Sequence, residues 1–115
     1  MQVSQERLQD VVVLRPEGRL DATNGPVLEE AAMAVIEAGD PEFVIDMKGV
    51  PYISSAGLGV LLKTAKRARA QGGRIALSGL EDSVNMVFEI SGFLTLFVVH
   101  ETAHDAVAMM GDGPC

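Results

Sequence analysis

Short apolar runs rich in β-branched residues alternate along this chain with longer segments in which apolar residues recur at helical spacing. The short runs predict buried strands, because β-branched and aromatic side chains fit the covered surface of a sheet. A weaker candidate, Val3–Leu8, is typical of an edge strand. The four buried candidates are Val11–Leu14, Phe43–Ile45, Arg74–Leu77 and Leu96–Val99.

The segments between these runs predict helices, because their apolar residues fall on one stripe of a 3.6-residue period. Local signals mark their ends: Thr23 or Asn24 can cap the first helix, and Gly72-Gly73 can stop the second. Thr102, followed three residues later by Asp105, resembles a capping box for the last. The expected helices run from about Pro26 to Ile36, from Ser54-Ser55 to about Gln71, from Glu81 to Ile90 and from Thr102 to about Met110.

Strands that alternate with helices indicate βαβ units, so we predict an α/β fold around a central, mostly parallel sheet. The first two strand candidates are close enough in sequence to form an antiparallel hairpin at one edge of this sheet. We expect about four helices, packed mainly on one face. The 115 residues suit one domain, with an ordered core over about 3–110 and a tail, 111–115, that should fray.

Composition narrows the class of protein. Hydrophobic residues make up 48% of the chain, which is enough for a packed core. The one cysteine, Cys115, cannot form an internal disulfide. The N-terminus lacks the pattern of a signal peptide, and the longest apolar run, 93–99, is too short to span a bilayer. We therefore expect a soluble, cytoplasmic protein without membrane contact.

Charge is distributed unevenly along the chain. The net charge of −7 argues against direct binding of nucleic acid. Yet no Asp or Glu occurs between Met47 and Leu80, a segment that holds six of the nine basic residues. Lys63, Lys66 and Arg67 fall on the helix face opposite the apolar stripe. This basic face is either a solvated surface or a patch that steers a partner.

Two adjacent serines, Ser54 and Ser55, stand where the strand Phe43–Ile45 gives way to the second helix. They lie beyond the carboxyl end of that strand, and ligands of parallel sheets bind at this rim. The first backbone N–H groups of a helix have no partner inside it and favour negative charge. A serine at this position can therefore either cap the helix or carry a phosphate.

Five motifs follow one another over about Val11 to Met110: Gly18-Arg19-Leu20-Asp21, Val44-Ile45-Asp46-Met47, Val50 to Leu62, Gly72-Gly73 and Ser91-Gly92-Phe93. Their order and spacing resemble the STAS domain of bacterial anti-sigma-factor antagonists. The resemblance implies a regulator without catalysis or cofactor, which acts by partner switching. The unphosphorylated form would bind an anti-sigma factor that is also a serine kinase of the histidine-kinase-like ATPase fold. Phosphorylation of one serine would abolish binding, and a serine phosphatase would restore it.

The resemblance also assigns residues. In the family motif Asp-Ser-Ser/Thr-Gly-Leu, Ser55 takes the place of the modified serine, and Gly57 and Leu58 match. Ser54 replaces the family Asp and carries no charge, and Ala56 replaces the second hydroxyl residue. The implied partner-binding residues are Asp21, Thr23, Ser54, Ser55, Ala56, Gly57, Leu58 and Lys63.

Two other functions compete with this interpretation. His100-Glu101-Thr102-Ala103-His104 matches the zinc-protease pattern H-E-x-x-H, but we expect His100 to end a strand, outside the helix that the motif needs. We therefore predict no metal site. The second alternative is a docking module without a phosphoswitch, such as a scaffold or a regulator bound to a transporter. Ser55 would then be a helix cap, and the basic face would be the contact surface.

Overall fold

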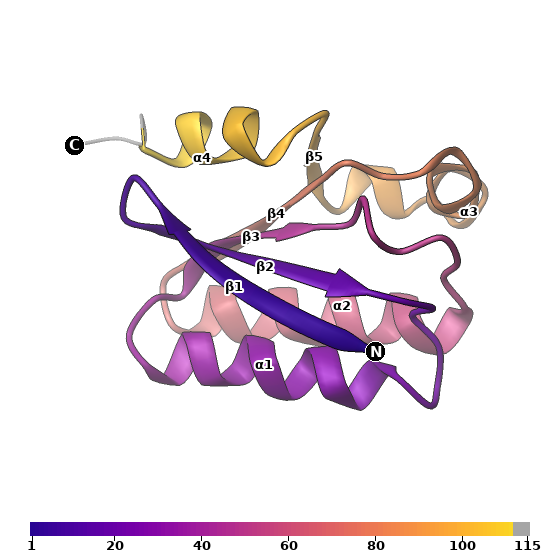
Figure 1. Ribbon diagram of the computed structural model, residues 1–115, viewed down its shortest axis with the longest axis horizontal. Helices are drawn as coiled ribbons and strands as arrows, with labels where there is room; N and C mark the ends of the chain where they lie inside the picture. Colours follow the sequence, from indigo (N-terminus) through magenta and orange to yellow (C-terminus); the bar gives the residue numbers. More distant parts are fainter. Residues whose placement is uncertain (112–115) are drawn as a thin grey trace.

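The protein is built around one five-stranded sheet, seen in a computed structural model that describes residues 1–111 (Figure 1). The strands lie in the order β1-β2-β3-β4-β5; β1 is antiparallel to β2, and the remaining neighbours are parallel. The strands are β1 (Gln2–Leu8), β2 (Val11–Glu17), β3 (Glu42–Asp46), β4 (Arg74–Ser78) and β5 (Val98–His100). The helices are α1 (Gly25–Glu37), α2 (Ser55–Ala70), α3 (Asp82–Ser91) and α4 (Ala103–Gly111), with a 3₁₀ turn η1 (Phe93–Thr95).

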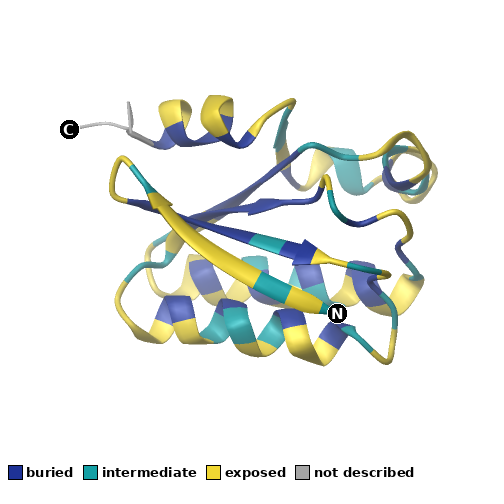
Figure 2. Cartoon of the chain, viewed as in Figure 1, coloured by how far each residue is buried: buried dark blue, intermediate teal, exposed yellow. Residues whose placement is uncertain are grey.

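The sheet is covered on both faces, because alternate side chains of its central strands enter two separate cores. On one face, Leu14, Phe43 and Leu77 belong to the larger core, which includes residues of α1, α2 and α3. On the other face, Val13 and Val44 pack in a smaller core with residues of α4. Figure 2 shows the result, with central strands buried and β1 largely exposed. The predicted α/β fold is confirmed, with α4 on the face opposite α1 and α2.

The opening hairpin turns through two residues with left-handed backbone. Gln9 and Asp10 have φ values of 48° and 68°, and the register pairs Leu8 with Val11. Two consecutive left-handed residues are typical of the type I′ turn, whose twist matches that of the flanking strands. The expected antiparallel edge hairpin is therefore present, although its turn carries no glycine.

The end of the chain departs from the sequence-based expectation. The last strand is Val98–His100 rather than Leu96–Val99. The 3₁₀ turn η1 intervenes after α3, whose C-cap residue is Gly92 with a φ of 80°. The aromatic ring of Phe97 packs against those of Phe88 and Phe93, with centroids 6.1 and 6.2 Å away, and this contact fixes where the strand begins. Gly111 is the last residue of α4, and the remainder of the expected frayed tail, 112–115, lies outside the described residues.

Candidate functional site

Two loops beyond the carboxyl ends of β2 and β3 are joined into one rim. Leu20 forms a parallel bridge with Ile53, more than thirty residues later in the chain. The Leu20 N–H donates to the Tyr52 carbonyl at 2.9 Å, and the Ser54 N–H donates to the Leu20 carbonyl at 3.0 Å. These bonds place the loop before α1 beside the loop before α2, so both helix starts lie at the same edge of the sheet (Figure 1).

The two serines at the start of α2 have different roles in the structure. Ser54 is the N-cap, and its Oγ accepts a hydrogen bond from the Gly57 N–H at 3.2 Å. Ser55 is the first helical residue and is exposed, and its hydroxyl makes no hydrogen bond within the described part of the chain. Under the alternative of a docking module without a phosphoswitch, Ser55 was expected to cap the helix, and this expectation is wrong. The cap is Ser54, which leaves the Ser55 hydroxyl accessible.

Gly57 and Leu58 pack against the domain instead of facing solvent. A Cβ built on Gly57 would lie 2.4 Å from the Leu20 carbonyl oxygen, so this position requires glycine for the close approach of α2 to the rim. Leu58 is buried in the larger core and is 6% exposed. Gly57 and Leu58 therefore shape the rim from within, whereas Ser55 and Ala56 are exposed. The part of these four residues in partner binding stays a prediction.

Asp21 organises the loop before α1. Its Oδ1 accepts hydrogen bonds from the N–H groups of Thr23 (3.1 Å) and Asn24 (2.9 Å), and its Oδ2 lies 3.7 Å from Nε of Arg19. Asn24 occupies the N-cap position but makes no side-chain cap bond; its amide donates to the Arg19 carbonyl at 2.8 Å. Asn24 is thus the N-cap residue, one of the two that the sequence predicted, but the side-chain acceptor for the loop is Asp21. Thr23 is exposed on the rim.

The sequence analysis missed an exposed pair on this rim. The guanidinium carbon of Arg19 lies 4.1 Å from the centroid of the Tyr52 ring, a cation–π arrangement. Tyr52 is 40% exposed although it is aromatic, and it is the one tyrosine of the chain. Arginine and tyrosine are enriched among residues that dominate binding energy at interfaces. Their proximity depends on the Leu20–Ile53 bridge, so a local sequence pattern could not have revealed it.

Lys63 lies two turns along α2 from the serines, at about 12 Å for eight residues of helix. Its ammonium forms an ion pair with Glu29 of α1 at 3.4 Å, and both side chains are partly exposed. The structure therefore brings Asp21, Thr23, Ser54 and Ser55 together at the rim and places Lys63 outside it, on the surface between α1 and α2.

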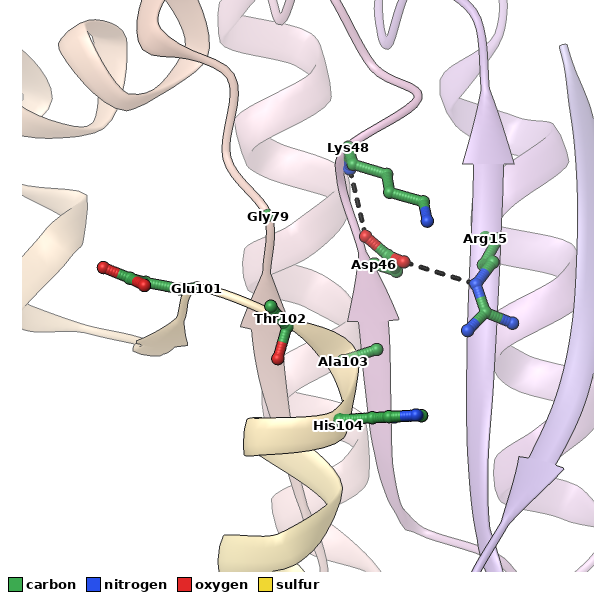
Figure 3. Close-up of a pocket in the computed structure, with 8 residues that line it drawn as sticks. All are labelled: Arg15, Asp46, Lys48, Gly79, Glu101, Thr102, Ala103 and His104. Carbon is green, nitrogen blue, oxygen red and sulfur yellow. Dashed lines mark hydrogen bonds and ion pairs between the residues drawn. The ribbon is translucent and has the colours of Figure 1, made fainter.

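A hollow lies on the other face of the sheet, beside the start of α4 (Figure 3). It has a volume of about 260 Å³, and its lining includes Arg15, Asp46, Lys48 and His104. Asp46 is 3% exposed and is held by Arg15 Nε at 3.3 Å and by the Lys48 N–H at 3.1 Å. Arg15 also pairs closely with Glu6, and the hydrogen bond to Glu6 is the main cause that raises the pKa of its guanidinium. Arg15 is thus paired with two carboxylates, Asp46 and Glu6, which indicates a structural network.

The H-E-x-x-H pattern is divided between a strand and a helix, as the sequence predicted. His100 is the last residue of β5, whereas His104 is in the first turn of α4. Between them, Thr102 Oγ1 accepts a hydrogen bond from the Asp105 N–H at 3.1 Å, as a cap does. Within residues 1–111, no group of three or more His, Cys, Asp or Glu side chains could hold a metal ion.

None of the helices in the described residues has the length and apolar character needed to cross a membrane.

The fold and the rim define the class: a small α/β domain with a mixed five-stranded sheet that presents an exposed serine at the head of a helix. Comparison with known families gives the same answer, because the STAS domain family matches residues 2–106. The chain belongs to the STAS domain family, and its curated relatives include proteins named anti-sigma factor antagonists.

Two relatives illustrate the similarity in sequence. The chain is 34% identical over 108 residues to BtrV of Bordetella bronchiseptica, a provisionally assigned anti-sigma factor antagonist, over 94% of this chain and 93% of that protein. It is 36% identical over 75 residues to the anti-sigma-B factor antagonist of Bacillus subtilis, over 65% of this chain and 68% of that protein.

Two solved structures illustrate the similarity in fold. An anti-sigma factor antagonist from Mycobacterium paratuberculosis superposes with a TM-score of 0.86 at 25% identity, over 96% of this chain and 94% of that one. The phosphorylated form of the Bacillus cell fate determinant SpoIIAA superposes with a TM-score of 0.72 at 22% identity, over 95% of this chain and 99% of that one. The second likeness concerns the fold alone.

Proposed function

We propose that the protein is an anti-sigma-factor antagonist that works by partner switching. In its unphosphorylated form it binds an anti-sigma factor that is also a serine kinase of the histidine-kinase-like ATPase fold. Phosphorylation of Ser55 releases the partner, and a serine phosphatase restores binding. The protein acts in the cytoplasm, has no catalytic activity of its own, and contacts neither nucleic acid nor a membrane directly.

The observation that carries this proposal is the division of roles between the two serines. Ser54 already caps α2, so the Ser55 hydroxyl is exposed and has no structural task in the described residues. A kinase can reach it without unfolding the helix. The relatives named as anti-sigma factor antagonists support the nature of the partner, and the phosphorylated form of SpoIIAA supports the kind of modification.

The chemistry of a phosphate at Ser55 fits a switch. It adds a charge of about −1.5 to −2 at neutral pH. The N-terminus of α2 stabilises negative charge by about 0.3–1 kcal/mol, so the free domain tolerates the modification. A partner packed against the rim must instead remove water from the same phosphate. The free energy of this desolvation is larger than the stabilisation that the helix N-terminus provides. Phosphorylation therefore leaves folding intact and weakens docking.

The rim supplies the contact surface that the switch controls. Arg19 and Tyr52 present an exposed cation and an exposed ring beside the serine loop. Oδ2 of Asp21 lies 3.7 Å from Nε of Arg19 and restricts this side chain before the partner arrives. Arg19 therefore loses less conformational entropy on binding. We infer that this pair anchors the partner and that Ser55 sets whether the partner can approach.

The test uses each histidine-kinase-like anti-sigma factor of the source genome, purified individually. Incubation with ATP should add one phosphate to the parent chain, localised to Ser55 by fragment mass analysis, and none to Ser55→Ala. Ser55→Ala should bind the partner, whereas Ser55→Asp should fold normally and bind much more weakly. Ser4→Asp adds the same charge on exposed strand β1 and should bind like the parent.

Three outcomes would contradict the proposal. Phosphate on a different residue would remove the role of Ser55. Equal binding by the parent, Ser55→Asp and the phosphorylated chain would favour a constitutive docking module. Failure of the parent to bind any of the anti-sigma factors would exclude the proposed partner class.

A further inference from the structure

Helices α1 and α2 lie side by side on one face of the sheet and run in the same direction (Figure 1). Two contacts fix their alignment. A Cβ on Gly25 of α1 would lie 2.9 Å from a methyl group of Val60, and Glu29 pairs with Lys63 at 3.4 Å. A residue of α1 therefore lies beside the residue about 34 positions later in α2.

The exposed sides of these two helices carry opposite charges. A groove of about 430 Å³ runs between them, and Met33 and Ala70 line it together with charged side chains. The charged lining of α1 is acidic, and that of α2 is basic. These residues are Glu29 and Glu37 on α1, and Lys63, Lys66 and Arg67 on α2.

The charges of the groove are only partly satisfied within the domain. Lys63 is paired with Glu29, but Lys66 and Arg67 are exposed and form no ion pair among residues 1–111. Closer to the rim, the exposed side of α2 carries small residues such as Ser55 and Gly59, and a Cβ on Gly59 would meet nothing within 4 Å. The surface between the serine loop and the free cations is therefore open to a partner's approach.

We propose that this groove receives a helix of the anti-sigma factor that carries acidic residues on the flank facing α2 and basic residues on the flank facing α1. The inference rests on the proposed function and adds this groove to the contact surface that the rim provides. Two walls of opposite sign select both the charge pattern and the direction of the incoming helix. Complementary charges of this kind mainly set partner choice and association rate.

A simpler account competes with this one. The basic patch could attract an acidic partner at long range without any groove contact, since steering depends on the summed charge of a surface. The two accounts differ when the walls are exchanged. Exchanging the charges of α1 and α2 leaves the net charge of the protein unchanged, so long-range attraction is preserved. A helix bound in the groove would then meet like charges on both of its flanks.

The experiment measures Kd for the same purified anti-sigma factors, at low and at high salt. Lys66→Glu with Arg67→Glu should weaken binding by roughly tenfold or more, because two contacts in the groove are reversed in charge. The matched control, Lys48→Glu with Arg69→Glu, makes the same change in net charge outside the groove and should change binding by less than about threefold. Arg67→Glu with Glu37→Lys exchanges a charge between the walls and should weaken binding at unchanged net charge. All losses should shrink at high salt.

The outcomes separate this inference from the proposed function. Groove variants that bind like the parent, while Ser55→Asp does not bind, would overturn the groove inference and leave the switch intact. Long-range steering would be the better account if the double variants in the groove and outside it lost the same affinity, and if Arg67→Glu with Glu37→Lys bound like the parent. A parent chain that binds none of the anti-sigma factors would overturn both. Circular dichroism of every variant confirms that lost binding is not lost folding.

Discussion

Replacing Gly57 with alanine tests whether the close approach of α2 to the Leu20 loop sets the geometry of the rim. The new Cβ would lie 2.4 Å from the Leu20 carbonyl oxygen and 2.9 Å from Cγ1 of Ile53. An ordinary contact begins near 3.4 Å, so the helix or the loop would have to move by about 1 Å. That movement strains the bond from the Ser54 N–H to the same carbonyl, at present 3.0 Å long.

The expected cost follows from three contributions. Overpacking costs about 1–3 kcal/mol, and a weakened hydrogen bond costs about 1 kcal/mol more. The higher helix propensity of alanine returns about 0.5–1 kcal/mol. Gly57→Ala should therefore lower the free energy of unfolding by about 1–3.5 kcal/mol. Each kcal/mol corresponds to about 3–6 °C in Tm for a domain of this size.

Gly59 is the matched control, because it lies in the same helix and an added Cβ would meet nothing within 4 Å. Gly59→Ala should stabilise the protein by about 0.5–1 kcal/mol through helix propensity alone. Urea denaturation followed by circular dichroism measures both variants against the parent. If Gly57→Ala proves as stable as Gly59→Ala, the contact with Leu20 does not constrain the rim and the argument from close approach is refuted.

Three further predictions concern polar groups, and each is measured by urea denaturation. Ser54→Ala should cost about 1 kcal/mol through the lost cap, and Ser55→Ala should stay within about 0.5 kcal/mol of the parent; equal effects would contradict the assigned roles. Asp46→Asn should cost about 1–2 kcal/mol, because it removes the buried charge that Arg15 contacts; an unchanged midpoint would show that Glu6 alone suffices as the partner of Arg15. Thr64→Val should stabilise by about 1 kcal/mol, because the buried Thr64 hydroxyl has no hydrogen-bond partner within residues 1–111, and destabilisation would reveal a partner.

The central strands and the helices could be predicted from the sequence because their signals are local. Val11–Leu14 and Phe43–Ile45 are short β-branched or aromatic runs, and both became central strands whose residues alternate between the two cores. The end of the sheet was less accessible to sequence reasoning. Leu96 belongs by composition to a strand, but the packing of Phe97 on other aromatic rings shifts the strand to Val98–His100.

The rim shows the same limit at the level of single residues. Both serines have the chemistry of a cap, and the choice between them depends on a one-residue difference in where α2 begins. Asp21 was found through its place in a motif, yet its hydrogen bonds to two N–H groups show that it also shapes the loop before α1. Arg19 and Tyr52 escaped notice because a bridge between distant loops brings them together.

The uncharged Ser54 bears on how sharp the proposed switch can be. In the family motif an acidic residue stands there, so the loop carries a negative charge before any modification. In this chain Ser54 is neutral, and the charges that the structure places on the rim, Arg19 and Asp21, lie 3.7 Å apart and offset each other. A phosphate on Ser55 would thus change a nearly neutral rim to one of about −1.5 to −2. Under the proposed function, all the negative charge in excess on this rim would come from the modification, and the neutral Ser54 would change what the proposed kinase meets beside its target.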